Sequence, residues 1–214
     1  MREVVLRQRR RRLVRWGHRV FFACAALTLG YCGFVVADAW IFQHQESRGL
    51  DRRLRQERQV GVVRLPGTPA ISSRSISAVA TGGMIGRLEI PRLNLSVMVM
   101  EGDSQHTLRR AAGHVPGTSL PGERGNVGIT GHRDTFFRPL RNIQPNDLIT
   151  VTTLQGEYRY RVISTRVVAP DNVAVLDSTG GEILTLVTCH PFYYVGPAPN
   201  RFIVRAERVP GDST

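Results

Sequence analysis

The chain has 214 residues and a mass of 23.9 kDa, which leaves room for one compact domain with attached segments. Its formal net charge is +12, but residues 1–83 carry +10 of it (15 Arg against 5 acidic residues) and residues 84–214 carry only +2 (14 Arg against 12 acidic residues). A nucleic-acid-binding domain would carry such a basic excess on its folded part, so this distribution argues against a nucleic-acid partner.

Residues 20–42 form an apolar stretch whose first 18 residues carry no charge, which is long enough for a membrane-spanning helix. A signal peptide would have a shorter apolar core, but residues 35–39 (VVADA) imitate a cleavage site, so cleavage is the alternative. Residues 1–19 carry eight Arg and one Glu, and the flank after the span is less basic. The positive-inside rule therefore predicts that residues 1–19 are a cytoplasmic tail and that the chain after about residue 43 lies outside.

Residues 43–83 are predicted to be a stalk and flexible linker. Residues 43–60 are polar and indicate a stalk helix that frays. Residues 61–83 are dominated by Gly, Ser, Thr and Pro without periodicity, which is typical of a flexible tether. We therefore expect few contacts between this tether and the domain that follows, and we expect residues 84–214 to fold alone.

Residues 84–210 show a different pattern, in which short apolar or alternating runs recur between turn signals. The predicted strands are 85–90, 95–100, 126–130, 147–153, 158–164, 183–188 and 201–209. One helix is predicted over 104–112, with Asp103 or Ser104 as its N-cap, and residues 154–158 indicate a hairpin turn. Many short strands with little helix predict a mostly β domain, a closed barrel of mostly antiparallel strands.

Cys189 is the only one of three cysteines in this domain, since Cys24 and Cys32 lie inside the predicted span. It has no partner for an intrachain disulfide, and an unpaired thiol outside the cell is a liability unless it has a function. A buried, inert cysteine is the alternative. No second thiol and no histidine pair at ligand spacing accompanies Cys189, so we expect no metal site.

A nucleophilic cysteine needs a nearby base or cation that keeps it as a thiolate. His132 follows the apolar run 126–130 and so lies at the end of a predicted strand, as Cys189 does. His114 is the second candidate, although its Gly/Pro-rich loop favours a local hydrogen-bonding role. Arg201 opens the strand after Cys189 and could stabilise negative charge on a carbonyl oxygen. Its alternative role is that of a surface arginine paired with a carboxylate.

The segment TLVTCHP at 185–191, followed by NRFIV at 200–204, resembles the sortase signature of Thr-Leu-X-Thr-Cys and a later Arg. The segment GNVGITGHRDTFFRPL at 125–140 is similar to the histidine segment of the same family. The resemblance covers residues 84–209 in order and looks most like class D sortases. His190 departs from it, because relatives often carry a tyrosine there.

The resemblance implies a sortase-like eight-stranded closed β-barrel with one or two short helices, preceded by a single transmembrane helix. It implies a cysteine transpeptidase in which Cys189 is the nucleophile, His132 the acid and base, and Arg201 the oxyanion-stabilising or substrate-positioning group. The residues that it suggests for a substrate groove are Thr188, Pro191 and Phe192.

The implied enzyme is a single-pass protein of the cell membrane with its catalytic domain outside. Its substrate would be a surface protein with an LPxTG-like sorting signal, and its acceptor an amine of a cell-wall precursor or of another protein subunit. The resemblance implies no cofactor and leaves calcium activation open. The alternatives are a cysteine peptidase that releases its product by hydrolysis, and a tethered peptide-binding module without activity, against which Cys189, His132 and Arg201 argue. An L,D-transpeptidase would carry a Ser-His-Gly-Cys motif, which is absent.

Overall fold

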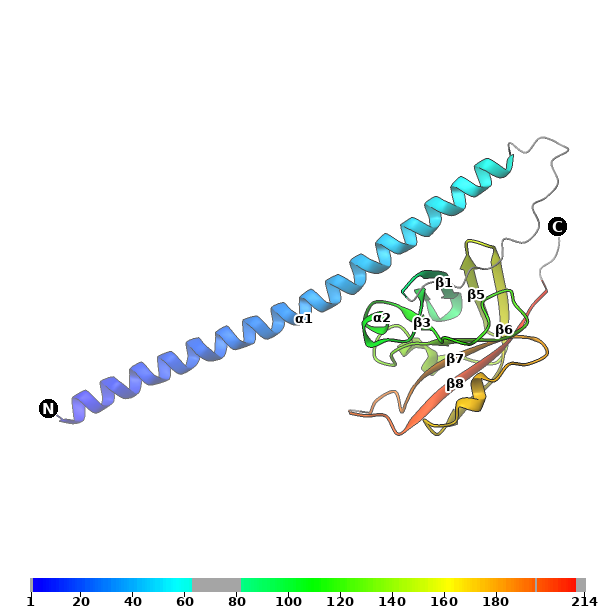
Figure 1. Ribbon diagram of the computed structural model, residues 1–214. Helices are drawn as coiled ribbons and strands as arrows, with labels where there is room; N and C mark the ends of the chain where they lie inside the picture. The colour runs from blue at the N-terminus through cyan, green and yellow to red at the C-terminus, as the bar shows by residue number, and fades with distance from the viewer. Residues whose placement is uncertain (1, 63–81, 195, 211–214) are drawn as a thin grey trace. The chain divides into compact units, whose positions relative to one another are not determined.

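The computed structural model describes residues 2–62, 82–194 and 196–210 (Figure 1). The chain divides into two units, Met1–Ile41 and Phe42–Thr214, which are described separately. Most of the tether predicted over 61–83 lies outside the described residues.

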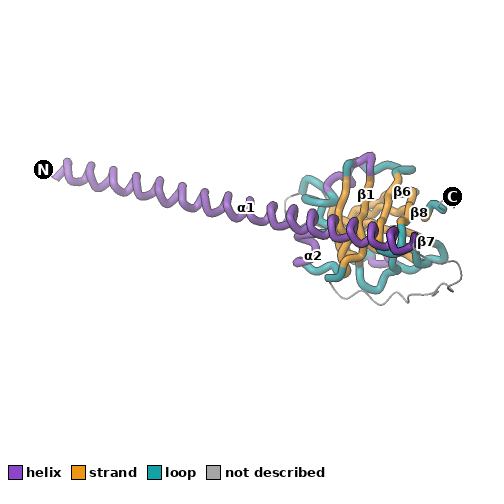
Figure 2. Tube along the Cα trace, turned by 90° about the horizontal axis from the view of Figure 1, so that it is seen from above, coloured by secondary structure: helices purple, strands orange, loops and turns teal. Residues whose placement is uncertain are grey.

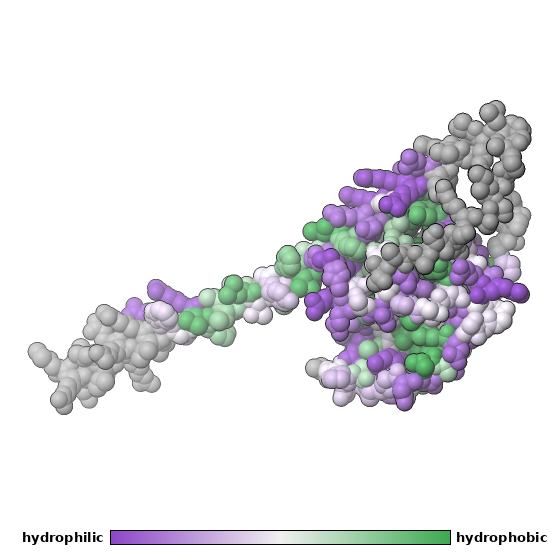
Figure 3. Space-filling model, in the orientation of Figure 1, coloured by the Kyte–Doolittle hydropathy of each residue, from purple (hydrophilic) through white to green (hydrophobic). Residues whose placement is uncertain are grey.

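The first unit belongs to α1 (Arg2–Val62), a helix of 61 residues. Its part Arg15–Gln56 contains an 18-residue window that is long and apolar enough to cross a membrane. Figure 3 shows green, apolar surface along part of this helix. The large apolar side chains exposed in the described part of this unit include Phe21, Phe22, Leu27, Leu29 and Phe34. An apolar helix that no protein covers is suited to lipid, so this helix could be a membrane anchor.

The second unit contains eight strands, which Figure 2 shows as one orange group seen from above. They are β1 (Met84–Ile90), β2 (Leu95–Glu101), β3 (Ala112–His114), β4 (Gly125–Thr130), β5 (Leu148–Thr153), β6 (Glu157–Val168), β7 (Glu182–His190) and β8 (Asn200–Arg208). The short helical elements between them are η1 (Pro91–Leu93), α2 (Gln105–Arg110), η2 (Arg138–Asn142) and η3 (Val173–Leu176).

The strands close into a barrel in the order β1-β2-β3-β4-β7-β8-β6-β5. Six of its ladders are antiparallel, and the β2–β3 and β4–β7 ladders are parallel. The predicted closed barrel of mostly antiparallel strands is therefore confirmed. The parallel β4–β7 pair matters most for function, because parallel neighbours end at the same rim of the barrel.

Most predicted local elements are present. Each of the seven predicted strands coincides with an observed one, and Ser104 caps α2 by accepting a hydrogen bond from the backbone N–H of Thr107 at 3.2 Å. The helix is shorter than predicted, because Ala112 belongs to β3, a three-residue strand that the sequence did not reveal. At the β5–β6 hairpin, the N–H of Thr153 donates to the carbonyl of Gly156 at 2.9 Å.

The barrel interior is filled by alternate residues of the strands. Leu88, Ile129, Ile149, Leu186 and Val204 are fully buried there and come from five different strands. Apolar burial of this kind is the main favourable contribution to the stability of the barrel.

The part of α1 around residues 43–51 contacts the barrel, which the sequence did not predict. The side chain of Gln43 accepts a hydrogen bond from the N–H of Met98 at 2.8 Å and donates one to the carbonyl of Arg110. Met98 is only 1% exposed although its neighbours Val97 and Val99 face the barrel interior, so its side chain is covered on the outer face of β2.

Two further contacts join this helix to β1. Arg87 donates to Ser47 at 3.0 Å and to the carboxylate of Asp51 at 3.1 Å. Leu50, between them on the helix, is completely buried. The segment predicted as a polar stalk thus has one face that packs against the barrel.

Candidate active site

Cys189 is the penultimate residue of β7, the strand that lies between β4 and β8 in the barrel. Its side chain is half-buried, and it has no disulfide partner. It therefore occupies a strand end with a structured neighbour on either side, from which a base and a cation could reach it.

Arg201 lies directly opposite Cys189 in the antiparallel β7–β8 ladder. Figure 1 shows these two strands side by side. Directly opposite residues project to the same face, with Cβ atoms about 4.5–5.5 Å apart. The register therefore places the guanidinium-bearing side chain and the thiol on one surface.

His132 approaches Cys189 from the other neighbouring strand. The parallel β4–β7 ladder pairs Thr130 with Val187, and the chain continues as Gly131 and His132 beyond the end of β4. Two hydrogen bonds prolong the pairing: Gly131 N–H donates to the Val187 carbonyl at 3.2 Å, and the Thr188 hydroxyl donates to the Gly131 carbonyl at 2.7 Å. Extending this register by one more residue brings His132 beside Cys189.

Thr188, which the resemblance suggested for the substrate groove, is instead buried. Its side chain is 2% exposed and is engaged with Gly131. A peptide on the surface would not touch this side chain, so its role is to fix the residue before His132 against β7. Gly131 itself is tightly packed, because a Cβ there would lie 2.9 Å from the ring of Phe137.

Arg201 is half-buried, and its guanidinium donates to the carbonyls of Asn200 and Ala198 at 3.1 and 3.3 Å. Among the described residues, no carboxylate forms an ion pair with it. The alternative role of a surface arginine paired with an acid is thus not observed in the described part of the chain. A cation without a fixed counter-ion can respond to negative charge that develops on a substrate.

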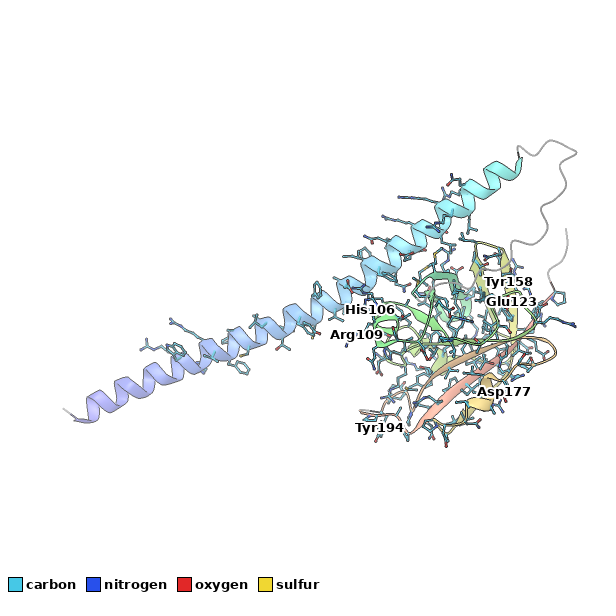
Figure 4. The ribbon with its side chains drawn as sticks, viewed as in Figure 1. His106, Arg109, Glu123, Tyr158, Asp177 and Tyr194 are labelled. Carbon is cyan, nitrogen blue, oxygen red and sulfur yellow. The ribbon has the colours of Figure 1, made fainter. Side chains whose placement is uncertain are left out.

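The loop after Cys189 has a buried side and an exposed side. On the buried side, Phe192 packs against the barrel core and forms edge contacts with the rings of His190 at 6.0 Å and Phe202 at 5.3 Å. On the exposed side, Tyr193 is 76% and Tyr194 47% exposed. Figure 4 shows Tyr194 on this loop. The loop that follows Cys189 thus packs Phe192 against the barrel core and exposes two tyrosines, while Pro191 is half-buried.

Sequence reasoning missed Arg133, the residue after His132. Its side chain is buried and donates to three backbone carbonyls of the loop after Cys189: those of Pro191, Tyr194 and Gly196. The only local signal was an arginine in the GHRD segment, and backbone carbonyl partners leave no signature in a sequence.

His114, the second candidate base, has a structural role. It is 2% exposed, and its Nδ1 lies 2.7 Å from Oε2 of Glu101. Its Nε2 lies 3.0 Å from the Ser119 carbonyl and 3.1 Å from the Thr118 hydroxyl. Both ring nitrogens thus face local partners, which supports the hydrogen-bonding role that we favoured from the sequence.

Of the remaining histidines, His190 adjoins Cys189 on β7, where successive side chains point to opposite faces, and its ring stacks on that of Phe202 at 6.2 Å. His106 is exposed on α2 (Figure 4), while His18 and His44 belong to α1. Within the part of the chain that the structure describes, no group of three or more His, Cys, Asp or Glu side chains could hold a metal ion. The β7–β8 register places Cys189 and Arg201 on one surface, and the chain beyond β4 leads to His132, so the side-chain types near this strand end are those that nucleophilic acyl transfer needs.

The chain was compared with known protein families and structures. The family model described as "Sortase domain" matches residues 88–209. Sortase D of Bacillus subtilis is 29% identical over 192 residues, which cover 89% of this chain and 96% of that protein. Sortase SrtE1 of Streptomyces coelicolor is 33% identical over 141 residues, covering 57% of this chain and 40% of that protein.

Solved structures show the same fold. The Clostridium perfringens Sortase D5 transpeptidase superposes with a TM-score of 0.63 at 22% identity, covering 79% of this chain and 99% of that one. The Streptococcus agalactiae sortase C1 structure has a TM-score of 0.56 at 32% identity, with 60% of this chain and 70% of that one covered.

Proposed function

Because the chain belongs to the sortase family of cysteine transpeptidases and its relatives include class D sortases, we propose that it cleaves an LPxTG-like sorting signal through a thioester on Cys189. The observation that carries this proposal is the register of three neighbouring strands. Cys189 on β7 has Arg201 directly opposite on β8 and His132 just beyond the end of β4.

The first half-reaction acylates the enzyme. The Cys189 thiolate attacks the carbonyl carbon of the threonine in the signal, and the carbonyl oxygen becomes negatively charged. Arg201 donates hydrogen bonds to this oxyanion. The carbon–nitrogen bond then breaks, His132 gives a proton to the leaving amine, and the acyl group stays on the sulfur as a thioester.

The second half-reaction resolves the thioester. An amine of a cell-wall precursor or of another protein subunit attacks the thioester carbonyl, and His132 takes a proton from it. The carbon–sulfur bond breaks, and the thiolate of Cys189 is restored. Cys189, His132 and Arg201 thus complete one cycle of bond exchange without a cofactor.

We place the catalytic domain outside the cell membrane. The apolar helix of the first unit would cross the bilayer once, with the arginine-rich residues 1–19 in the cytoplasm. Protease added to intact cells should then digest an epitope attached after residue 214 and spare one attached before residue 1. The reverse pattern would refute this orientation.

The decisive test is incubation of the full chain in detergent with an LPxTG-type peptide and a small amine. Mass spectrometry should detect an acyl adduct on Cys189 and a peptide product joined to the amine. Release of the free acid alone would instead identify a hydrolytic peptidase, and peptide binding without cleavage would identify an inactive module. Either result would contradict the proposed transfer.

A further inference from the structure

Arg133 is a buried cation beside the candidate active site. Its side chain is 7% exposed, and it directly follows His132 in the chain. Its Nη1 donates to the Pro191 carbonyl at 3.0 Å, and its Nη2 donates to the carbonyls of Tyr194 at 2.6 Å and Gly196 at 3.0 Å.

Burial of a guanidinium is costly unless its N–H groups and its charge have partners. Among the described residues it forms an ion pair only with Asp134, which is 3.4 Å from Nε and 70% exposed, so solvent screens this pair. The ring of Tyr194 lies 5.9 Å from the guanidinium carbon and adds a cation–π contact. The partners of the buried guanidinium are therefore mainly the loop carbonyls.

These carbonyls belong to the loop that joins Cys189 to Arg201. The first of them, on Pro191, is two residues after Cys189, and the third, on Gly196, is five residues before Arg201. Arg133 thus connects the backbone at His132 to both halves of this loop. A rigid guanidinium suits this task, because its planar fork holds several acceptors at fixed directions.

We propose that Arg133 is a positioning residue that holds the loop after Cys189 as one wall of the peptide groove and fixes it relative to His132. This inference rests on the proposed function, because it assigns the groove to a sorting-signal peptide. Arg133 touches neither substrate nor reacting atoms, and it acts through the loop. A loop that is no longer held in place must be ordered when the peptide binds, and this ordering lowers the affinity for the peptide.

The proposal separates Arg133 from a residue that merely stabilises the barrel. Loss of the loop contacts should weaken peptide binding while the Cys189 thiol stays reactive toward a small neutral reagent. The effect on kcat/KM should therefore lie mainly in KM. Increased mobility should be confined to residues 191–194 and 196–199 rather than spread over the strands.

The experiment compares Arg133→Ala and Arg133→Lys with the wild-type full chain in detergent, below the unfolding temperature of each. Arg138→Ala is the matched control, because Arg138 is exposed on η2 and its loss removes the same charge. The measurements are kcat and KM for an LPxTG-type peptide, the rate of Cys189 alkylation by iodoacetamide, and backbone hydrogen exchange.

For Arg133→Ala we expect kcat/KM to fall by about tenfold or more, alkylation to stay within about twofold, and loop exchange to rise. Arg133→Lys should keep the charge but restore only part of the activity and protection, and Arg138→Ala should match the wild type. If the alanine variant fails to fold, the lysine variant alone decides the question.

Several results would overturn the proposal. One is an Arg133→Lys variant whose kcat/KM and loop exchange equal those of the wild type. Another is an Arg133→Ala variant that loses activity only in kcat, or whose Cys189 alkylation falls in parallel with its activity. The last is hydrogen exchange that rises across the whole barrel rather than in the loop. If the wild-type chain itself does not cleave the peptide, the proposed function fails. Hydrogen exchange of the loop still tests the role of Arg133 in that case.

Discussion

Cys189 and Arg201 occupy directly opposite positions of the antiparallel β7–β8 ladder, so hydrogen-bonded backbone sets their spacing although 11 residues separate them in the chain. A site built on paired strands is held more precisely than one built on loops alone. The guanidinium itself also contacts the carbonyls of Ala198 and Asn200, which limits its freedom of orientation.

Arg201→Lys tests whether this residue acts through its shape or only through its charge. Lysine is a point charge on a flexible stem and cannot reproduce a planar fork of donors. We expect kcat/KM to fall by at least about tenfold, or about 1.4 kcal/mol of transition-state stabilisation, and Arg201→Ala to fall further. Arg166→Lys on an exposed position of β6 is the control. Near-normal turnover of Arg201→Lys would reduce Arg201 to a general electrostatic role.

Cys189→Ala should abolish cleavage of the peptide and leave the barrel folded. The side chain is half-buried at a strand end, so a smaller group there leaves no sealed cavity. Peptide turnover and thermal unfolding, followed by circular dichroism, check the two parts of the prediction. Residual cleavage would contradict the thioester mechanism, and unfolding would support the alternative of an inert structural cysteine.

His132→Ala and His114→Ala should have opposite effects. His132 is half-buried just beyond the end of β4, where the β4–β7 register leads toward Cys189, so its loss should remove activity with little change in stability. His114 is buried among Glu101, Thr118 and Ser119, so its loss should cost about 1–3 kcal/mol of stability by leaving buried groups without partners. Activity per folded molecule should survive in His114→Ala. An inactive but stable His114→Ala variant would instead identify His114 as the acid and base and His132 as the structural residue.

Asp147 links stability to pH through Arg92. The hydrogen bond from Arg92 lowers the pKa of Asp147 below its usual value, with a further contribution from the Gln144 N–H at 2.8 Å. A lowered pKa in the folded state adds stability above the unfolded pKa of about 4, and this stability is lost as the pH falls through the folded pKa. Asp147→Asn should therefore be less stable than the wild type at pH near 7.

The difference between Asp147→Asn and the wild type should shrink as the pH falls from about 4 through the lower folded-state pKa of Asp147, because its carboxyl is then protonated in the folded state as well. Thermal unfolding of both proteins across this range measures it. Exposed Asp134→Asn provides the control, since its carboxylate is 70% exposed. A difference that is independent of pH would show that Asp147 stabilises the turn by packing rather than by its charge.

Local features of the fold were predictable, and long-range ones were not. The seven predicted strands follow from runs of apolar and β-branched residues, whereas β3 has only the residues Ala, Gly and His and gives no such signal. The places of Cys189, His132 and Arg201 at strand ends could be read from the sequence. Their convergence depends on the parallel β4–β7 pairing, which joins segments more than 50 residues apart.

The contact between residues 43–51 and the barrel was hidden for a similar reason. These residues are mainly polar, so their composition indicated a solvated stalk. The contact depends on a few side chains, chiefly Gln43, Ser47, Leu50 and Asp51, and on a second apolar face of β2 around Met98. The run LSVMVM did indicate this second face, because it is apolar at successive positions instead of alternating with polar residues. Such a pattern is typical of a strand that is covered on both faces.

Leu50→Ala tests whether this helical segment belongs to the cooperative unit of the barrel. Leu50 is completely buried, and removal of buried methyl groups from a leucine typically costs about 2–5 kcal/mol. We expect a loss near the lower limit, about 2 kcal/mol, because the helix can adjust against the barrel surface more easily than a residue in a closed core. Thermal unfolding of the full chain in detergent, followed by the near-ultraviolet signal of the barrel tyrosines, measures this loss.

Arg53→Ala is the control, since Arg53 is exposed on the same helix and should leave the unfolding temperature unchanged. If Leu50→Ala unfolds the barrel at the wild-type temperature, the helix is only loosely attached, and residues 84–214 are an independent domain as the sequence predicts. A lower unfolding temperature for Leu50→Ala alone would move the start of the catalytic domain from residue 84 toward Phe42. The linker between them would then connect two parts of one folded unit rather than tether the barrel to the membrane helix.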